Sequence, residues 1–444
     1  MARMFGTDGI RGIANKDLSC ELAVRVGRSA ATVLTKHLNK NARIIIGRDT
    51  RISGEMLEQA LAAGICSAGA DAVLLGVVPT PAVSYLVKLY GADAGVMITA
   101  SHNPVQYNGI KIFNGDGFKL PDDIEDEIEA QVKNGGGECD DDIGRITRRE
   151  VAAIDYVEHV IRELDTDLSG LRVVFDCANG ASSETARRIF GRLGCECIFT
   201  GAEPNGLNIN DGVGSTHLDH LQALVLREKA DIGVAFDGDA DRCLAIDETG
   251  AEIDGDKIIA ILSLAMKEKG ELSRNTAVVT VMSNLGFMEF ARNHNIKVES
   301  TVVGDRYVLE EMRRGGYKIG GEQSGHVILF DHAVTGDGQL TALALLSRLK
   351  ESGLKASELA SIMEKYPQVI LNVAANAEQK ARFKEDEELA GFIQAQQQEL
   401  FSTGRVLVRP SGTEPYIRVM VEGKDKNAIE SVAWAIRQRI EERI

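Results

Sequence analysis

One order of predicted segments occurs three times along the chain, and this repeat constrains the fold more than any other feature. A β-type apolar run leads through a polar loop to a helical stretch, a second short strand, and a third strand that ends in a Gly- or Ser-rich loop. The first strands are predicted at residues 43–46, 171–175 and 277–281, the second at 72–75, 197–199 and 297–302, and the third at 95–98, 232–236 and 317–319. Alternating strands and helices indicate βαβ units with right-handed crossovers and mostly parallel pairing. We therefore predict three similar mixed-sheet α/β domains.

The last ~75 residues break this pattern and predict a small α+β domain. Strands are expected at residues 368–373, 405–408 and 416–421, with one long charged helix at 381–398. A closing amphipathic helix carries one apolar face, formed by Ile429, Val432, Ala433, Ile436 and Ile440. The predicted domains are residues 1–153, 154–254, 255–366 and 367–444. Their joints are expected near residues 135–142, at the turn 254–256, and at Tyr366-Pro367.

Composition excludes several classes of function. The formal net charge of −16 argues against a general nucleic-acid surface, although a few local Arg side chains can still hold one phosphate. No apolar run approaches the ~20 residues of a membrane helix, and the first residues lack the pattern of a secretory signal. The seven cysteines are scattered and read as reduced thiols. We expect a cytoplasmic protein with no membrane and no nucleic-acid partner; a homodimer is left open.

A serine follows the third strand of the first repeat, in the stretch Thr-Ala-Ser-His-Asn-Pro at residues 99–104. The preceding apolar run at 94–98 reads as a buried strand, which places Ser101 in the loop just past its end. In open α/β sheets that edge is where ligands bind. An ordinary polar turn is the alternative for this stretch taken alone.

Three carboxylates follow the equivalent strand of the second repeat, in Asp-Gly-Asp-Ala-Asp-Arg at residues 237–242. Side chains at alternate positions can converge on one side, and hard oxygen ligands suit Mg²⁺. A solvated acidic turn is one alternative. An EF-hand Ca²⁺ loop is excluded, because Arg242 stands at its sixth position, where Gly is required. The stretch predicts a magnesium site.

Two further loops could bind a phosphorylated sugar. In Gly-Gly-Glu-Gln-Ser-Gly-His at 320–326, Glu322 and Ser324 could hydrogen-bond sugar hydroxyls, and His326 could meet a phosphate or a proton. A structural Gly-rich turn is an equally good interpretation. The stretch Arg-Pro-Ser-Gly-Thr-Glu-Pro at 409–415 combines a guanidinium, two hydroxyls and an exposed backbone, which are phosphate-binding devices. A long hairpin turn is its alternative.

Three other residues are candidates for chemistry near Ser101. His102 is its chain neighbour, and Lys111 lies ten residues later, close enough to return to it. We expect these two to handle protons. Arg11, among glycines near the N-terminus, is interpreted equally well as an anion contact or as part of a structural turn.

Together, the four motifs at residues 99–104, 237–242, 321–326 and 409–415 resemble those of the α-D-phosphohexomutases, in the same order and spacing over essentially the whole chain. The resemblance implies three α/β domains and one α+β domain around a central cleft. It also implies a phosphoserine at Ser101, with Mg²⁺ held by that phosphate and by Asp237, Asp239 and Asp241. One motif is loose, because residues 105–107 read Val-Gln-Tyr where the family more often has an acidic residue.

Within the family, residues 6–12, residues 303–308 and the Gln of the Gly-Glu-Gln-Ser-Gly-His motif resemble bacterial members that act on glucosamine phosphates. This implies an isomerase that interconverts glucosamine 6-phosphate and glucosamine 1-phosphate through glucosamine 1,6-bisphosphate, feeding UDP-N-acetylglucosamine and cell-wall precursor synthesis. The expected catalytic residues are Ser101, His102, Lys111 and Arg11. The expected substrate-binding residues are Glu322, Ser324, His326, Asp305, Arg306, Arg409, Ser411, Gly412, Thr413 and Arg418.

Three alternatives remain on sequence grounds. The first is the same chemistry on glucose or mannose phosphates. A phosphatase of the haloacid-dehalogenase type, with Asp237 as nucleophile, would leave the motifs around Ser101 and Arg409 unexplained. A non-catalytic phosphosugar-binding regulator would have no need of Ser101 beside three metal carboxylates.

Overall fold

The computed structural model describes residues 3–6, 8–137, 139–164, 166–400, 403–411 and 415–444. The chain divides into two compact units, one comprising residues 1–282 and 296–362 and the other residues 283–295 and 363–444. None of the described helices is long and apolar enough to cross a membrane. We describe each unit by itself.

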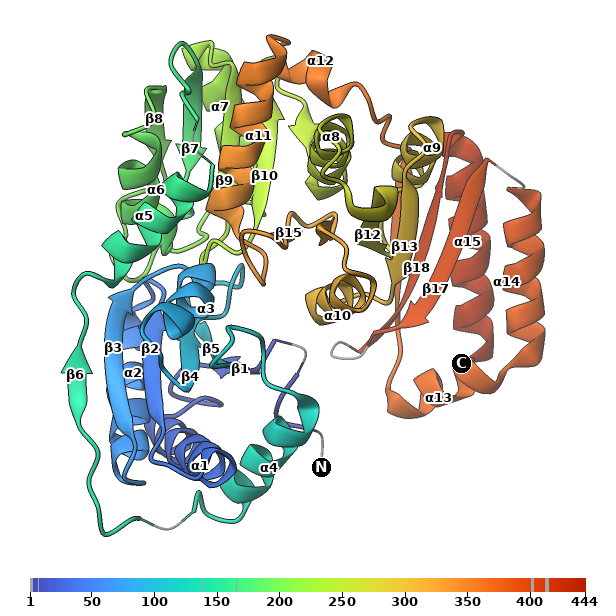
Figure 1. Cartoon of the computed structure of the whole chain (residues 1–444). Helices are drawn as coiled ribbons and strands as arrows, with labels where there is room; N and C mark the ends of the chain where they lie inside the picture. Colours follow the sequence, from blue (N-terminus) through green and yellow to red (C-terminus); the bar gives the residue numbers. More distant parts are fainter. Residues whose placement is uncertain (1–2, 7, 138, 165, 401–402, 412–414) are drawn as a thin grey trace. The chain divides into compact units, whose positions relative to one another are not determined.

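The first unit begins with a six-stranded sheet in the order β1-β5-β4-β2-β3-β6 (Figure 1). Its strands are β1 (Ile10–Ile13), β2 (Arg43–Arg48), β3 (Asp71–Val77), β4 (Ala94–Ile98), β5 (Tyr107–Asn114) and β6 (Ile146–Arg148). Its helices are α1 (Cys20–Leu38), α2 (Ile52–Cys66), α3 (Thr80–Leu89), α4 (Asp122–Lys133) and α5 (Ala152–Glu163). The core strands β2 and β4 pair in parallel, whereas β5 returns antiparallel to β4.

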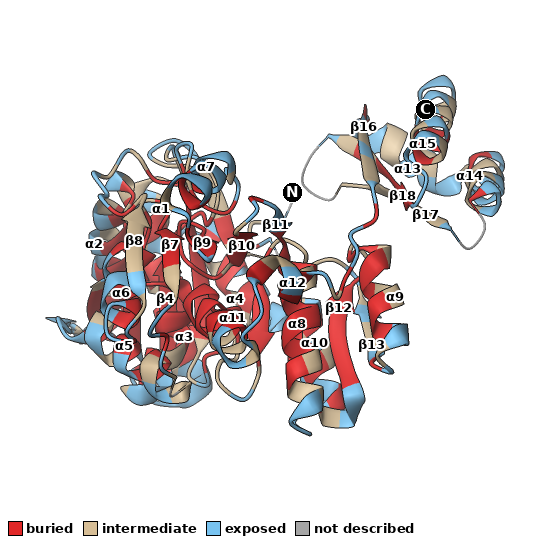
Figure 2. Cartoon of the chain, turned by 90° about the horizontal axis from the view of Figure 1, so that it is seen from above, coloured by how far each residue is buried: buried red, intermediate tan, exposed pale blue. Residues whose placement is uncertain are grey.

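The second sheet has five strands in the order β11-β10-β9-β7-β8. They are β7 (Arg172–Asp176), β8 (Glu196–Thr200), β9 (Ile232–Phe236), β10 (Cys243–Asp247) and β11 (Glu252–Ile253), with helices α6 (Ser182–Phe190) and α7 (Asp219–Glu228). Every residue of β9 is buried, and the strand is red in Figure 2. A strand buried on both faces has a continuous apolar sequence. The strand itself was predicted at residues 232–236.

The third sheet has four strands in the order β13-β12-β14-β15. They are β12 (Thr276–Thr280), β13 (Lys297–Thr301), β14 (Ile319–Gly321) and β15 (Val327–Leu329). The accompanying helices are α8 (Gly255–Glu268), η1 (Ser273–Asn275), α10 (Asp305–Gly315), α11 (Gly338–Ser352) and α12 (Ala356–Ala360). The side chain of Asp254 caps α8 by accepting a hydrogen bond from Lys257 N, so the turn that was expected as a joint is the start of a helix.

The predicted threefold repeat is confirmed. In each sheet the first strand of the repeat lies between the second and third and runs parallel to both. The third strand then returns through a loop as an antiparallel strand, in the pairs β4–β5, β9–β10 and β14–β15. These returning strands were not predicted. The three connecting loops carry the Ser101, aspartate and Gly-Glu-Gln-Ser-Gly-His motifs, so the motifs occupy equivalent places in three similar sheets.

The second unit is a three-stranded antiparallel sheet with helices, in agreement with the predicted α+β class. Its elements are β16 (Gln368–Ala374), α13 (Ala377–Glu385), α14 (Glu387–Glu399), β17 (Gly404–Pro410), β18 (Tyr416–Gly423) and α15 (Lys426–Arg443), together with α9 (Leu285–Asn293). The apolar face predicted for the last helix is buried. Buried Glu422 of β18 ties α9 to this unit by accepting hydrogen bonds from Asn284 Nδ2 and Leu285 N.

The prediction of a single long helix at residues 381–398 is wrong. Asp386 separates α13 from α14 with an extended backbone, and its side chain caps α14 by accepting a hydrogen bond from Leu389 N at 2.9 Å. Arg443 of α15 holds the same carboxylate at 2.6 Å. The break therefore depends on a cap and an ion pair that the apolar spacing does not reveal.

Candidate active site

Ser101 lies at the tip of the β4–β5 loop, 1% exposed, with a backbone φ of 52°. This left-handed conformation is uncommon for a residue other than Gly and marks a constrained loop. Thr99 Oγ1 accepts a hydrogen bond from Ser101 N at 2.9 Å. Ser101 Oγ donates a hydrogen bond to Asp237 Oδ2 at 2.6 Å, which joins the serine loop directly to the aspartate loop.

Gly238 permits this close approach. A Cβ built on Gly238 would lie 2.6 Å from the carbonyl oxygen of Ser101 and 2.9 Å from Asn210 Nδ2. Both distances are shorter than a van der Waals contact, so any side chain would push the two loops apart. The glycine in the Asp-Gly-Asp motif is explained by this contact as well as by the bend of its own loop.

We therefore expect that Gly238→Ala lowers kcat by about 100-fold, because a displacement of about 1 Å in a reacting group has an effect of that size. The assay is the steady-state rate of the isomerase reaction that the sequence resemblance implies, with a thermal melt to confirm folding. Gly391→Ala in α14 is the matched control, since a Cβ there meets nothing within 4 Å. Unchanged activity in Gly238→Ala would contradict the role given to this contact.

The three aspartates form the one cluster of three or more metal-binding side chains found in the described part of the chain. One carboxylate oxygen from each of Asp237, Asp239 and Asp241 lies within 4.8 Å of the others, and all three residues are buried. In Asp239, Oδ2 accepts hydrogen bonds from Thr80 Oγ1 at 2.6 Å and from Lys111 Nζ at 2.9 Å. The second oxygens, Asp239 Oδ1 and Asp241 Oδ1, are buried and have no hydrogen-bond partner among the described residues. Such oxygens fit the ligands of a hard cation such as Mg²⁺.

Electrostatics also favour a cation at this cluster. Burial, together with the Asp241 and Asp239 carboxylates, raises the pKa of Asp237 well above its ordinary value. Burial opposes the charge of Lys111, but the Asp239 and Asp241 carboxylates outweigh it and raise the pKa of the ammonium. Arg242 Nε also lies 3.9 Å from Asp237 Oδ2 and 3.8 Å from Asp241 Oδ1. Lys111 and Arg242 together compensate only part of the negative charge once Ser101 carries a phosphate, and a divalent ion would complete the compensation.

The two expected proton-handling residues contact different parts of the site. His102 Nδ1 is 3.5 Å from Ser101 Oγ. Burial, with the positive charges of Arg242 and Arg11, lowers the pKa of His102 to about 4. Lys111, 3% exposed on β5, reaches the aspartate cluster rather than the serine hydroxyl.

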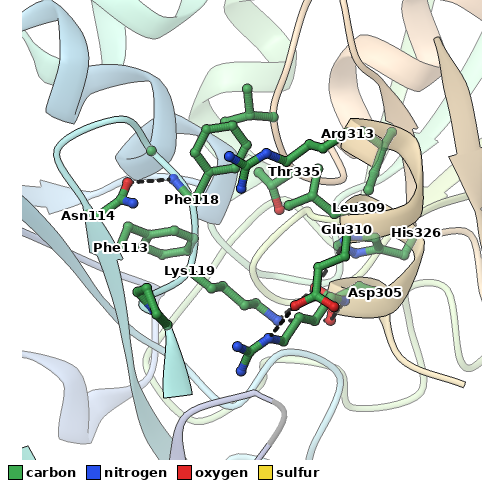
Figure 3. Close-up of a pocket in the computed structure, with 15 residues that line it drawn as sticks. Phe113, Asn114, Phe118, Lys119, Asp305, Leu309, Glu310, Arg313, His326 and Thr335 are labelled. Carbon is green, nitrogen blue, oxygen red and sulfur yellow. Dashed lines mark hydrogen bonds and ion pairs between the residues drawn. The ribbon is translucent and has the colours of Figure 1, made fainter. Parts of the chain in front are cut away.

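Arg11 lies on β1, which pairs with β5 opposite Gly109. Its Nη2 is 3.1 Å from Asp8 Oδ2, and the other oxygen of Asp8 lies 2.9 Å from Lys119 Nζ. Lys119 also contacts Asp305 Oδ2 at 2.7 Å, and Figure 3 shows it pointing from the first sheet toward the start of α10. This ion-pair chain joins the first sheet to the third.

The third loop contributes the expected sugar-binding residues. Glu322 and Ser324 are half-buried at the β14–β15 turn, and Glu322 Oε1 accepts a hydrogen bond from Gly304 N at 3.1 Å. His326 is buried, with Nδ1 3.6 Å from Asp241 Oδ2 and Nε2 3.6 Å from Asp305 Oδ2. The structure thus brings this loop to the aspartate cluster.

A pocket of about 250 Å³ lies beside this loop, between the first and third sheets (Figure 3). Asp305, Arg306 and His326 line it, together with Phe118, whose ring lies 4.3 Å from the guanidinium carbon of Arg313. The Arg306 guanidinium is 3.0 Å from Glu310 and 2.5 Å from Asp122. Two of the expected substrate-binding residues, Asp305 and Arg306, therefore line a pocket, and both make ion pairs.

The second unit contains Arg409, Ser411 and Arg418, which are expected to bind the substrate phosphate. Arg409 on β17 stands opposite Arg418 on β18, and Ser411 N donates a hydrogen bond to Tyr416 O at 2.8 Å. Lys380 Nζ donates to Ser411 O at 2.7 Å, which adds a cation that the sequence did not indicate. Gly412 and Thr413 lie outside the described residues.

Other contributors to the site were also missed. The residues that contact the site but were not among the predicted ones are Asp8, Asp49, Arg51, Thr80, Thr99, Lys119, Asn210 and Arg242. Thr99 and Arg242 lie inside the motifs and could have been found there. Thr80 and Asn210 stand in stretches with no pattern of their own, so the sequence carried no signal for them.

Family models cover most of the chain. Four models of the phosphoglucomutase/phosphomannomutase family match it: alpha/beta/alpha domain I at residues 2–137, domain II at 154–250, domain III at 254–366, and the C-terminal domain at 370–439. They occur in the order of the three sheets and the α+β region.

A curated phosphoglucosamine mutase from Thermoanaerobacter sp. (strain X514) is 53% identical to the chain over 448 residues, covering 100% of both. Among solved structures, a phosphoglucomutase/phosphomannomutase family protein from Burkholderia thailandensis matches with a TM-score of 0.83 at 24% identity, covering 100% of this chain and 98% of that one. The N-acetylphosphoglucosamine mutase of Aspergillus fumigatus, solved with GlcNAc-6P and magnesium, matches with a TM-score of 0.67 at 16% identity, covering 99% and 96%. At these identities the two structures show the shared fold.

Proposed function

Because the chain belongs to the phosphoglucomutase/phosphomannomutase family, the α-D-phosphohexomutases, we propose that it acts as a phosphoglucosamine mutase. It would interconvert glucosamine 6-phosphate and glucosamine 1-phosphate. The observation that carries this proposal is the 2.6 Å hydrogen bond between Ser101 Oγ and Asp237, inside a buried cluster of three aspartates. A full-length relative at 53% identity with that activity in its name supports the choice of sugar.

In the proposed cycle Ser101 carries a phosphoryl group. The free sugar hydroxyl of glucosamine 6-phosphate attacks this phosphorus, the bond from phosphorus to Ser101 Oγ breaks, and glucosamine 1,6-bisphosphate forms. The bisphosphate turns, and Ser101 Oγ attacks the other phosphate, which releases glucosamine 1-phosphate. In each half-reaction the attacking hydroxyl loses its proton, and the oxygen that leaves the phosphorus gains one. The cycle is therefore balanced without another reactant.

His102 and Lys111 are the proposed groups for moving that proton. His102 Nδ1 lies 3.5 Å from Ser101 Oγ, a distance that shortens readily on ligand binding. Lys111 Nζ lies 2.9 Å from Asp239 Oδ2, at the aspartate cluster. Arg11, on the strand beside Lys111, adds positive charge near the transferring phosphoryl group.

Asp237, Asp239 and Asp241, with the Ser101 phosphate, would hold Mg²⁺. The free oxygens of Asp239 and Asp241 and the crowding of three negative charges support this assignment. The ion would neutralise charge on the transferring group. The chain's own residues do the rest: they fix the serine, the carboxylates and the sugar in one alignment.

Substrate binding is proposed for two regions of the chain. Glu322, Ser324 and His326, with Asp305 and Arg306 beside them, would hold the sugar in both orientations. Arg409, Ser411, Gly412, Thr413 and Arg418 would hold the phosphate that is not reacting. Arg409 and Arg418 stand at facing positions of an antiparallel pair, where like charges repel each other, and an anion bound by both would relieve that repulsion. We also propose that the chain has four domains, which end at residues 153, 254, 366 and 444.

The experiment that tests the function compares initial rates on the 6-phosphates of glucosamine, glucose and mannose. We expect kcat/KM to be at least about 10-fold higher for glucosamine 6-phosphate, because a site built to pair a polar group rejects analogues that lack it. Glucose 1,6-bisphosphate is added at the same concentration in all three assays to phosphorylate Ser101. A preference for glucose or mannose phosphate would assign the chain to that other activity, and turnover of none would contradict the enzyme proposal.

A further inference from the structure

Two carbonyl oxygens of the serine loop each accept hydrogen bonds from two donors outside the loop. Arg51 Nη2 donates to the carbonyl oxygens of Ser101 and Asn103, at 3.0 and 2.8 Å. Asn210 Nδ2 donates to the same two oxygens, at 2.9 and 3.1 Å. Arg51 Nη1 adds a bond of 2.6 Å to the carbonyl oxygen of Pro104. The backbone from 101 to 104 is therefore held by one guanidinium and one amide.

Both donors are fixed in place. Arg51 is 1% exposed, and its Nε lies 2.9 Å from Asp49 Oδ2, which also accepts a hydrogen bond from Thr99 Oγ1 at 2.7 Å. Asn210 is 6% exposed and donates its backbone N–H to Ala178 O at 2.9 Å. Arg51 precedes α2 beside the first sheet, whereas Asn210 belongs to the connection between β8 and α7 of the second. The serine loop is thus clamped between two sheets.

This clamp acts on a conformation that the loop would not adopt by itself. Ser101 has a φ of 52°, which is unfavourable for a residue with a Cβ. Its carbonyl group must point at the two donors for Ser101 Oγ to lie 2.6 Å from Asp237. If the peptide groups rotated, the strain would be relieved and the hydroxyl would move off the aspartate cluster.

We propose that Arg51 and Asn210 are positioning residues for phosphoryl transfer, which hold the backbone of the serine loop so that Ser101 stays aligned with the aspartates. The inference rests on the proposed function, in which Ser101 carries the phosphate. Among the described residues, neither side chain makes a hydrogen bond or ion pair with Asp237, Asp239 or Asp241 or with the expected sugar-binding residues, so their effect is transmitted through Ser101.

The test uses Asn210→Ala in the full chain. We expect kcat to fall about 10- to 100-fold, as for a reacting group displaced by a fraction of an ångström, with KM for glucosamine 6-phosphate changed by less than about threefold. Single-turnover transfer from glucose 1,6-bisphosphate to Ser101, followed by intact mass, should slow by the same factor as kcat. A merely structural role would lower the melting temperature and the fraction of active enzyme without slowing transfer in the folded molecules.

Asn208→Ala is the matched control, because Asn208 lies in the same connection but its side chain bonds only to Asn205 N and Glu203 O among the contacts described. Its kcat should stay within about twofold of the parent. Arg51→Lys is the second variant: it keeps a positive charge beside Asp49, but one ammonium cannot reach all the acceptors. It should show the same loss in kcat and in transfer rate.

Three outcomes would overturn the inference: unchanged kcat in Asn210→Ala, a rise in KM without a loss in kcat, or an equal loss in Asn208→Ala. Failure of the proposed function is distinguishable, since it would appear as full activity in Ser101→Ala. An inactive Ser101→Ala together with a fully active Asn210→Ala would overturn the positioning role alone.

Discussion

Ser101→Ala should have no measurable mutase activity, which corresponds to a loss in kcat of at least about 1000-fold, the scale seen when a covalent nucleophile is removed. The physical reason is that Ser101 Oγ is the atom that leaves and then attacks in each cycle, and alanine offers no oxygen for the phosphoryl group. Since Ser101 Oγ donates a hydrogen bond to Asp237, the variant also frees one carboxylate oxygen. The measurement is conversion of glucosamine 6-phosphate, with peptide mapping of the phosphorylated parent enzyme.

Ser29→Ala provides the matched control, because Ser29 is a fully buried serine of the first α/β region whose Oγ has no hydrogen-bond partner in the described structure. Its activity should equal that of the parent. Phosphate found on Asp237 instead of Ser101 would be lost in acid, where a phosphoserine survives, and would support the phosphatase alternative. Full activity in Ser101→Ala would refute the proposed cycle.

Removal of divalent metal is the second change expected to have a large effect. Chelation should lower kcat by at least about 100-fold, and added Mg²⁺ should restore it, because Lys111 and Arg242 compensate only part of the negative charge of three buried carboxylates and a phosphate dianion. Asp239→Asn should raise the Mg²⁺ concentration needed for half-maximal activity by about tenfold or more. Asp239 Oδ1 has no hydrogen-bond partner among the described residues, whereas Oδ2 is held by Thr80 and Lys111.

Asp247→Asn tests whether any loss of a buried negative charge has this effect. Asp247 is 3% exposed and lies at the end of β10 that is farther from the aspartate loop. Its Oδ1 accepts hydrogen bonds from Thr249 N and Ala251 N. The Mg²⁺ dependence of this variant should match that of the parent. Activity that survives complete chelation, verified by metal analysis, would argue against a metal requirement.

The threefold repeat could be predicted because its signals are local. Apolar runs, their lengths and the loops after them are properties of neighbouring residues, and the same order recurs around Ser101, Asp237 and Glu322. The returning strands β5, β10 and β15 were missed because no local pattern shows that the segment after a polar loop turns back to pair with the strand before that loop. The break at Asp386 between α13 and α14 was missed because Arg443, which pairs with Asp386, lies 57 residues farther along the chain.

The sequence by itself determined the three-sheet and α+β architecture and the chemical groups placed after each third strand. Its spacing also made Lys111 a candidate for the site, but the structure pairs Lys111 with Asp239 and Asp241 rather than with the Ser101 hydroxyl. Only the tertiary structure decided which oxygens of the aspartates are held and which are free, and which side chains support Ser101. Thr80 reaches Asp239 across 159 residues, and Asn210 reaches Ser101 across 109. Such hydrogen bonds depend on how separate sheets pack against one another, and no local pattern encodes that packing.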